Sequence, residues 1–139
     1  MSFREKSAWA TFISLLVVYI PYFIYVYLLA ARGQLIIATA VEVFIAGVIV
    51  QIVIAIIAHI AISIRSRRDP VDERDTAVQA RAFRNAYFVL TFGIFLAAMY
   101  MTLAGLLAAA IAIQVVLLCL VCSEATRYAT QIVGYRRGI

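Results

Sequence analysis

Residues 65–85 read RSRRDPVDERDTAVQARAFRN, and this is the only long polar stretch in a chain of 139 residues. It holds six of the 12 basic residues and four of the 7 acidic ones. Hydrophobic residues make up 66% of the whole chain, and its mean hydropathy is +1.03. A soluble domain averages about 45–50% apolar residues, so a water-soluble core cannot take up this surplus. The sequence therefore indicates a membrane protein in which the polar stretch lies outside the bilayer.

Apolar runs flank this stretch, two on each side. A helix needs about 20 apolar residues to cross a hydrocarbon layer about 30 Å thick. The first run is too long, and too poor in a small-residue cleavage site, to be a removable signal peptide. We therefore expect an all-α membrane protein with a single four-helix transmembrane domain. Its spans are expected at about 7–30, 35–64, 86–101 and 104–122, with a polar helix and loop at 65–85 and a polar tail at 123–139.

The basic residues fall on one side of this arrangement. The amino-terminal cap, the central stretch and the tail hold all but one of the 12, and the short connection after the first span holds the other, Arg32. Because basic loops are retained in the cytoplasm, we expect both termini and the central stretch to be cytoplasmic. The net charge of +5 then reflects membrane topology, and we expect no nucleic-acid partner. The two cysteines share one apolar run and form no extracellular disulfide framework.

Small residues predict a close contact between the third and fourth spans. A spacing of four between small residues lets two helix backbones approach. We expect a tight hairpin with a minimal turn through Thr102 and Leu103, and a tail helix that frays near Gly134. The small residues concerned are Gly93, Ala97, Ala104, Ala108 and Ala112. In the first span, the stripe of Tyr19, Phe23 and Tyr27 is expected to pack on a neighbouring helix.

The central stretch predicts a helix that begins at Asp69-Pro70 and continues into the third span. Aspartate is a favoured N-cap, and proline is tolerated at the first helical position. The acidic residues of this helix have no basic residue four positions later, so their partners are expected elsewhere: the basic loop, the tail or a second protomer. The expected interaction surface consists of Asp72, Glu73, Arg74, Asp75, Arg81 and Arg84.

The run from Asp72 to Asp75, DERD, is followed by an alanine-rich turn with Arg81 and then by an apolar span. This pattern resembles a family of small, uncharacterised four-span bacterial membrane proteins with a DERD-type motif between spans two and three. The resemblance covers about residues 65–100 and implies a location in the bacterial inner membrane. It implies no catalytic residue, because that family has no assigned activity.

Asp69, Asp72 and Asp75 also follow a D-x-x-D-x-x-D pattern. Membrane-embedded transferases use such carboxylates to hold Mg²⁺ and a diphosphate, because carboxylates three residues apart can share a hard cation. Those enzymes carry a second acidic motif, and this chain has none. A helix start rich in acidic residues is the simpler interpretation, so we expect no enzyme activity.

Three polar residues interrupt the second span: Glu42, Gln51 and His59. At about 100° per residue, Gln51 lies half a turn from Glu42, and His59 lies about 80° from Gln51. An ionisable residue within a span is a functional candidate, so these residues form a candidate ion or proton site. Glu42, near the outer end of an overlong helix, is also compatible with simple interfacial exposure.

Cys119 and Cys122 share a helix face, and with His59 they form a candidate metal site. Thiols in apolar helices usually serve as packing residues, so we expect neither a metal nor another cofactor. Gln51 and Gln114 are expected to form hydrogen bonds between helices.

These observations favour a non-enzymatic membrane protein that acts as an interaction, regulatory or accessory subunit through its charged cytoplasmic helix. Its expected partners are the lipid bilayer, anionic lipid headgroups, further copies of the chain and a cytosolic protein. The alternative is a small oligomeric transporter or channel, coupled to protons or cations, that uses Glu42.

Overall fold

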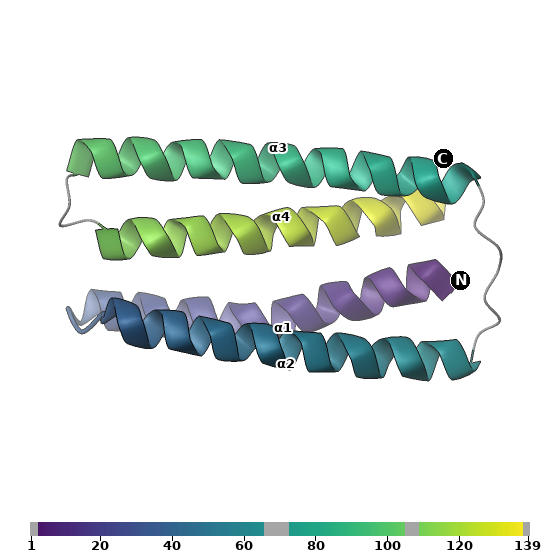
Figure 1. Cartoon of the computed structure of the whole chain (residues 1–139), viewed down its shortest axis with the longest axis horizontal. Helices are drawn as coiled ribbons and strands as arrows, with labels where there is room; N and C mark the ends of the chain where they lie inside the picture. The colour runs from purple at the N-terminus through teal and green to yellow at the C-terminus, as the bar shows by residue number, and fades with distance from the viewer. Residues whose placement is uncertain (1–2, 66–72, 105–108, 138–139) are drawn as a thin grey trace.

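The computed structural model of the chain consists of helices and describes residues 3–65, 73–104 and 109–137. The helices are α1 (Phe3–Ala31), α2 (Ile37–Arg65), α3 (Glu73–Ala104) and α4 (Ala109–Arg137). Each is long and apolar enough to cross a membrane, and together they pack as a bundle (Figure 1). The predicted all-α, four-span architecture is therefore confirmed.

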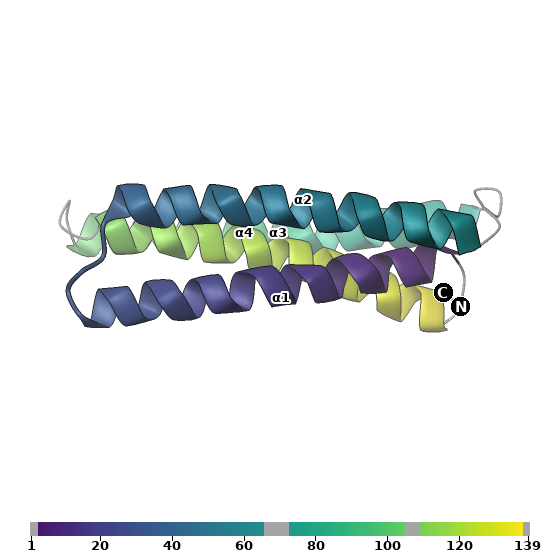
Figure 2. The ribbon, with the colours of Figure 1, turned by 90° about the horizontal axis from the view of Figure 1, so that it is seen from below.

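The helices lie in the order α3, α4, α1, α2, and α1 and α4 form the middle of this row (Figure 1). α1 packs against both α2 and α4, and α4 packs against both α1 and α3. α2 packs extensively on α1 alone, so the row is open. Figure 2 shows α1 and α2 along opposite edges of the view, joined by the turn after α1. Only 6% of the apolar window of α2 is buried, against 28% for α1. The outer surface of α2 therefore presents apolar side chains to the lipid.

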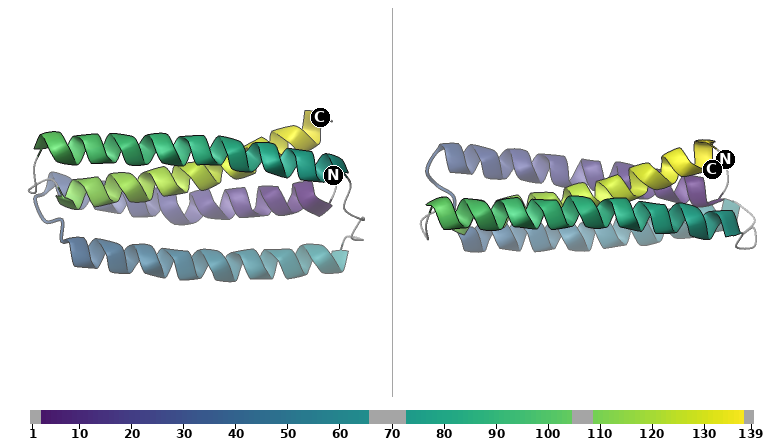
Figure 3. Two further views of the ribbon diagram at one scale, coloured as in Figure 1. Left: turned by 45° about the horizontal axis from the view of Figure 1, so that its top comes forward. Right: turned by 90° about the horizontal axis from the view of Figure 1, so that it is seen from above.

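The first and last described residues lie at the same end of the bundle, together with the end of α2 and the start of α3 (Figure 1). We call this the charged end: residues 3–9, 57–65, 73–85 and 124–137. The C-terminal part of α4 runs beside the N-terminal part of α1 there (Figure 3).

The turn between α1 and α2 follows from its glycine. Gly33 has a φ of +67°, a left-handed conformation that glycine adopts without steric cost. The amide of Gly33 donates to the carbonyl of Ala30, and that of Gln34 donates to Leu29. This pair of hydrogen bonds satisfies the last carbonyls of α1 and ends the helix.

The core between α1, α2 and α4 is aromatic. Tyr19 and Tyr22 on α1 are buried against Phe44 of α2, with ring centroids 5.4 and 5.3 Å apart. The Tyr22 and Phe44 rings meet edge to face, at an interplanar angle of 65°, and gain from this contact as well as from burial. Of the predicted stripe, Tyr19 is buried and Phe23 is partly buried, but Tyr27 is 72% exposed. The stripe prediction was wrong for Tyr27, because the buried face turns toward Tyr22 and Val26.

α3 and α4 form the tight hairpin that the small residues predicted. A methyl group at Gly93 would lie 2.5 Å from Cβ of Cys119, so only glycine fits there. Ala97 and Ala112 are almost fully buried. The predicted turn at Thr102 and Leu103 was wrong, because both residues are helical. The remaining members of the predicted contact, Ala104 and Ala108, lie outside the residues whose side chains are described.

α4 does not fray at Gly134 as predicted; it continues to Arg137. A methyl group at Gly134 would lie 2.8 Å from Cγ1 of Val78, so this glycine marks a second close approach between α3 and α4. The packing partner on α3 holds the tail helix in place.

Candidate functional site

Charged side chains tie the charged end together. Arg4 on α1 forms an ion pair with Asp75 on α3, with a nitrogen–oxygen distance of 3.0 Å. Arg136 on α4 pairs with the buried Glu5 of α1 at 3.4 Å. Each pair joins helices that are far apart in sequence. The start of α3 and the end of α4 are therefore fixed to the first turns of α1.

Arg74 and Arg127 add two further contacts. The guanidinium of Arg74 donates to the carbonyl oxygen of Tyr135, at 3.2 Å, which links α3 to α4. Arg127 pairs with Glu124 one turn earlier on α4, at 3.1 Å, and its guanidinium lies 4.2 Å from the centre of the Phe83 ring. A cation over an aromatic face is attracted by the ring's electrons. This stacking fixes Arg127 against α3.

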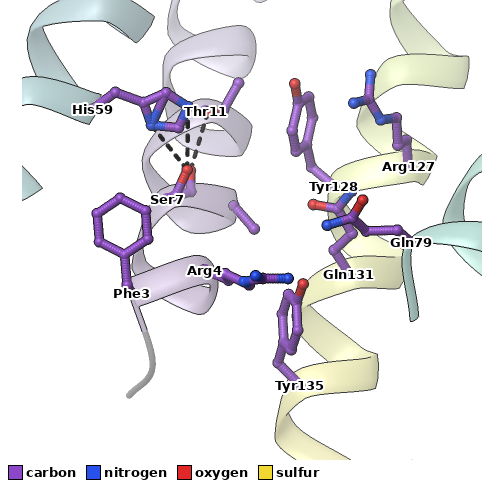
Figure 4. Close-up of a pocket in the computed structure, with 11 residues that line it drawn as sticks. Phe3, Arg4, Ser7, Thr11, His59, Gln79, Arg127, Tyr128, Gln131 and Tyr135 are labelled. Carbon is purple, nitrogen blue, oxygen red and sulfur yellow. Dashed lines mark hydrogen bonds between the residues drawn. The ribbon is translucent and has the colours of Figure 1, made fainter. Parts of the chain in front are cut away.

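A polar cavity of about 230 Å³ lies between the helices at this end (Figure 4). All four helices contribute to its lining, and the side of α4 is crowded with polar groups (Figure 4). Its two arginines are engaged by Asp75 and Glu124, so the lining offers hydrogen bonds more than net charge. The polar side chains around it are Arg4, Ser7, Thr11, His59, Gln79, Arg127, Tyr128, Gln131 and Tyr135.

A seam of hydroxyl groups runs down α1 from this cavity. Ser7 Oγ lies 3.0 Å from Nδ1 of His59, and Ser14 Oγ accepts a hydrogen bond from Nε2 of Gln51 at 2.8 Å. A second cavity of about 240 Å³ shares Thr11 and Tyr128 with the first, and Gln51 lines it. The buried Oε1 of Gln51 has no hydrogen-bond partner in the described chain. Polar side chains therefore line adjoining cavities from the charged end to the level of Gln51 inside the bundle.

A buried hydrogen-bonded group lies deeper, where α1, α2 and α4 meet. The hydroxyl of Tyr22 lies 2.7 Å from Oε1 of Gln114 and 3.1 Å from the carbonyl oxygen of Ala40. Gln51 and Gln114 thus both form the hydrogen bonds between helices that the sequence predicted. In an apolar surrounding such bonds fix the rotation of each helix about its axis.

The predicted ion or proton residues are not brought together. Gln51 and His59 bind different hydroxyls of α1, Ser14 and Ser7. Glu42 is exposed, half a turn from Gln51, and its side chain makes no hydrogen bond or ion pair within the described ranges. Glu42 therefore lies outside the polar seam.

The three metal candidates are also apart. Cys119 packs against Gly93 of α3, whereas His59 of α2 contacts Ser7 of α1. Cys122 is exposed. Residues 3–65, 73–104 and 109–137 contain no group of three His, Cys, Asp or Glu side chains that could hold a metal ion.

The predicted interaction surface divides into two parts. Arg74 and Asp75 contact the chain's own α4 and α1. Glu73, Arg81 and Arg84 are exposed on α3. Asp72 lies outside the described residues, as does Asp69 of the candidate diphosphate motif, so the acidic cluster is described only from Glu73 onward.

The sequence analysis overlooked two members of the charged end. Glu5 stands one residue after Arg4 in a short cap and gave no pattern, yet it is 8% exposed and pairs with Arg136. Tyr135 contributes a backbone carbonyl and one wall of the polar cavity. A contact made by a backbone carbonyl does not depend on the residue type, so the sequence cannot predict it. The pairing of Glu5 could have been predicted only from the basic residues of the tail, which an acidic side chain would attract.

A comparison of the chain with protein-family models, with curated proteins and with solved structures found no match. The four apolar helices support a multi-pass membrane protein. The resemblance to DERD-type bacterial membrane proteins stays a prediction.

Proposed function

We propose that this protein is a non-enzymatic accessory subunit of a membrane assembly, which binds a helix of a partner protein through the outer face of α3 at the charged end. We further propose that it resides in the bacterial inner membrane, with the charged end in the cytoplasm, because the basic residues concentrate there.

The depth of the bilayer along α3 and α4 supports a projecting charged end. Arg84 is the last charged residue of α3, and Glu124 is the first of α4. Ser123 donates a hydrogen bond to the carbonyl oxygen of Ala86 at 2.8 Å, so the two polar-to-apolar boundaries lie at the same level. Beyond that level α3 continues for about 20 Å, at about 1.5 Å per residue. This part of α3 reaches past the hydrocarbon layer.

One face of this projecting segment is the proposed binding site for the partner helix. Glu73, Ala77, Ala80 and Arg84 follow a spacing of four, three and four, which places them on one side of a helix. All four are exposed. The alanines allow another helix to approach closely, and the charges at the two ends select its direction and register.

The same face argues against a second copy as the partner. Copies in one membrane share their orientation, so a two-fold axis along the membrane normal brings their α3 helices together in parallel. Glu73 would then meet Glu73, and Arg84 would meet Arg84. A partner helix with a basic residue opposite Glu73 and an acidic one opposite Arg84 fits the face better.

The test is affinity purification in mild detergent, with co-purifying proteins quantified by mass spectrometry. The variant Glu73→Arg combined with Arg84→Glu keeps the net charge and inverts the pattern. Like charges placed opposite each other across an interface cost several kcal/mol, so we expect the inverted variant to bind the partner at least about ten-fold more weakly.

Arg32→Glu, a charge reversal at the opposite end of the bundle, is the control and should retain the partner. A co-purification profile that is the same for the wild type and the inverted variant would contradict the proposed function.

A further inference from the structure

A second surface of the charged end lies between α3 and α4, on a different side from the polar cavity. A groove of about 390 Å³ runs there, with an arginine from each helix along its rim. Its walls combine hydroxyl and amide groups with the apolar side chain of Val133, and no acidic residue lines it. The groove residues used below are Arg81, Asn85, Thr130 and Arg137.

The arginines of the groove differ from four other arginines at this end. The side chains of Arg4, Arg74, Arg127 and Arg136 are bound to acceptors within the chain. Those of Arg81 and Arg137 are exposed and make no hydrogen bond or ion pair with any described residue. Two guanidinium groups therefore line one groove, and neither has an acidic partner among residues 3–65, 73–104 and 109–137.

The inner end of the groove lies at the boundary between the charged end and the apolar part of α3. Its lower edge is Asn85, next to Ala86, where the apolar part of α3 begins. Arg81 is about one turn further out, roughly 6 Å along the axis. The polar layer on each side of a bilayer is about 5–8 Å thick. Arg81 therefore lies at the depth of the lipid phosphate groups.

The directions of α3 and α4 bring the two arginines together. Side chains lean toward the N-terminus of their helix. α4 ends at the charged end, so Arg137 leans back toward the membrane, whereas Arg81 of the antiparallel α3 leans outward. These directions bring the two head groups closer together along the bundle axis than the backbone positions of the two residues, and both residues line the same groove.

We propose that this groove binds the phosphate headgroup of an anionic phospholipid. The two guanidinium groups clamp the phosphate, which they match with paired hydrogen bonds. Thr130 Oγ1 accepts a hydrogen bond from Asn85 at 3.3 Å, so its own proton can be donated to the ligand.

This site is separate from the face of Glu73 and Arg84, so lipid binding and partner binding can fail independently. The test is native mass spectrometry of the detergent-solubilised protein, titrated with phosphatidylglycerol and, in parallel, with phosphatidylcholine. The groove variant is Arg81→Gln combined with Arg137→Gln. The matched control, Arg32→Gln with Lys6→Gln, loses the same charge from exposed basic residues outside the groove.

A basic residue near an anionic headgroup contributes about five-fold to binding, so the groove variant should bind phosphatidylglycerol about 25-fold more weakly. The control variant and the wild type should agree within about two-fold, and both should prefer phosphatidylglycerol to phosphatidylcholine. Equal losses in the two variants would show attraction by net charge alone and would overturn the site, as would no loss in either.

Two further arms complete the test. Arg81→Lys combined with Arg137→Lys keeps the charge and should retain part of the affinity; if it binds as weakly as the glutamine variant while the helical signal is intact, the phosphate clamp is wrong. Inorganic phosphate is added as a competitor. Displacement of phosphatidylglycerol by phosphate at equal concentration would overturn the lipid assignment in favour of a free anion.

Discussion

Two single residues decide how closely the helices of this bundle approach. Gly93 leaves room for the side chain of Cys119, and Tyr22 supplies the hydroxyl that links α1 to Gln114 and to the backbone of α2. In a membrane, helices gain little from the hydrophobic effect, so packing and hydrogen bonds determine which faces meet. Both residues therefore have roles that a similar side chain cannot take over.

Gly93→Ala should destabilise the bundle. Its methyl group would lie 2.5 Å from Cβ of Cys119, so α3 and α4 must separate. Overpacking of this kind costs about 1–3 kcal/mol. Thermal unfolding in detergent, followed by circular dichroism, measures the effect. Gly47→Ala is the control, because its methyl group would lie 3.4 Å from Cγ1 of Val18 and fits; equal melting temperatures for the two variants would contradict the prediction.

At the scale of elements, α1 organises the bundle because it carries polar groups on two levels. Ser7 and Ser14 bind α2, and Tyr22 binds α4. Arg4 and Glu5 fix the first turn of α1 to α3 and α4. Within the described chain, α1 is thus the one helix joined to each of the others by side-chain hydrogen bonds or ion pairs.

The ion pair of Arg4 with Asp75 should couple α1 to α3. Both side chains are only about one fifth exposed, at 20% and 18%, so salt screens the pair less than a surface pair. A double-mutant cycle of Arg4→Ala and Asp75→Ala should give a coupling energy of about 0.5–1 kcal/mol in thermal or denaturant unfolding. Glu124→Ala breaks a pair within one helix and serves as the control. Strict additivity of the Arg4 and Asp75 effects would show that the pair contributes nothing.

At the scale of the whole molecule, most charged residues of the described chain gather at one end of the bundle. Both described chain ends and the facing ends of α2 and α3 lie at the charged end (Figure 1). The opposite end carries the connection with Arg32. An orientation with the charged end inside the cell places every proposed contact in the cytoplasm.

Cysteine labelling tests this orientation. After Cys119 and Cys122 are replaced by alanine, a membrane-impermeant maleimide should label Gln34→Cys in intact bacteria and Arg137→Cys only after permeabilisation. Both positions are exposed in the structure, so a lack of access reflects the membrane. Labelling of Arg137→Cys in intact cells would invert the topology, and with it the side on which a partner could bind.

The sequence by itself determined the number of apolar helices long enough to span a membrane and the gathering of charge at one end. Those properties follow from length and composition, because lipid excludes charge and a helix must be long enough to cross it. It also predicted the contact at Gly93 and the bonds of Gln51 and Gln114, since a small or polar residue in an apolar run has few other uses.

Only the tertiary structure decided the order of the helices and the roles of the charged residues. A span that is apolar on every side does not reveal which face packs, so the sequence could not place α2 at the edge of the row or Glu42 outside the polar seam. Ion pairs such as Glu5 with Arg136 join opposite ends of the chain. These ion pairs form only because the bundle places the ends of different helices side by side. The residues next to each partner in the sequence do not predict this placement.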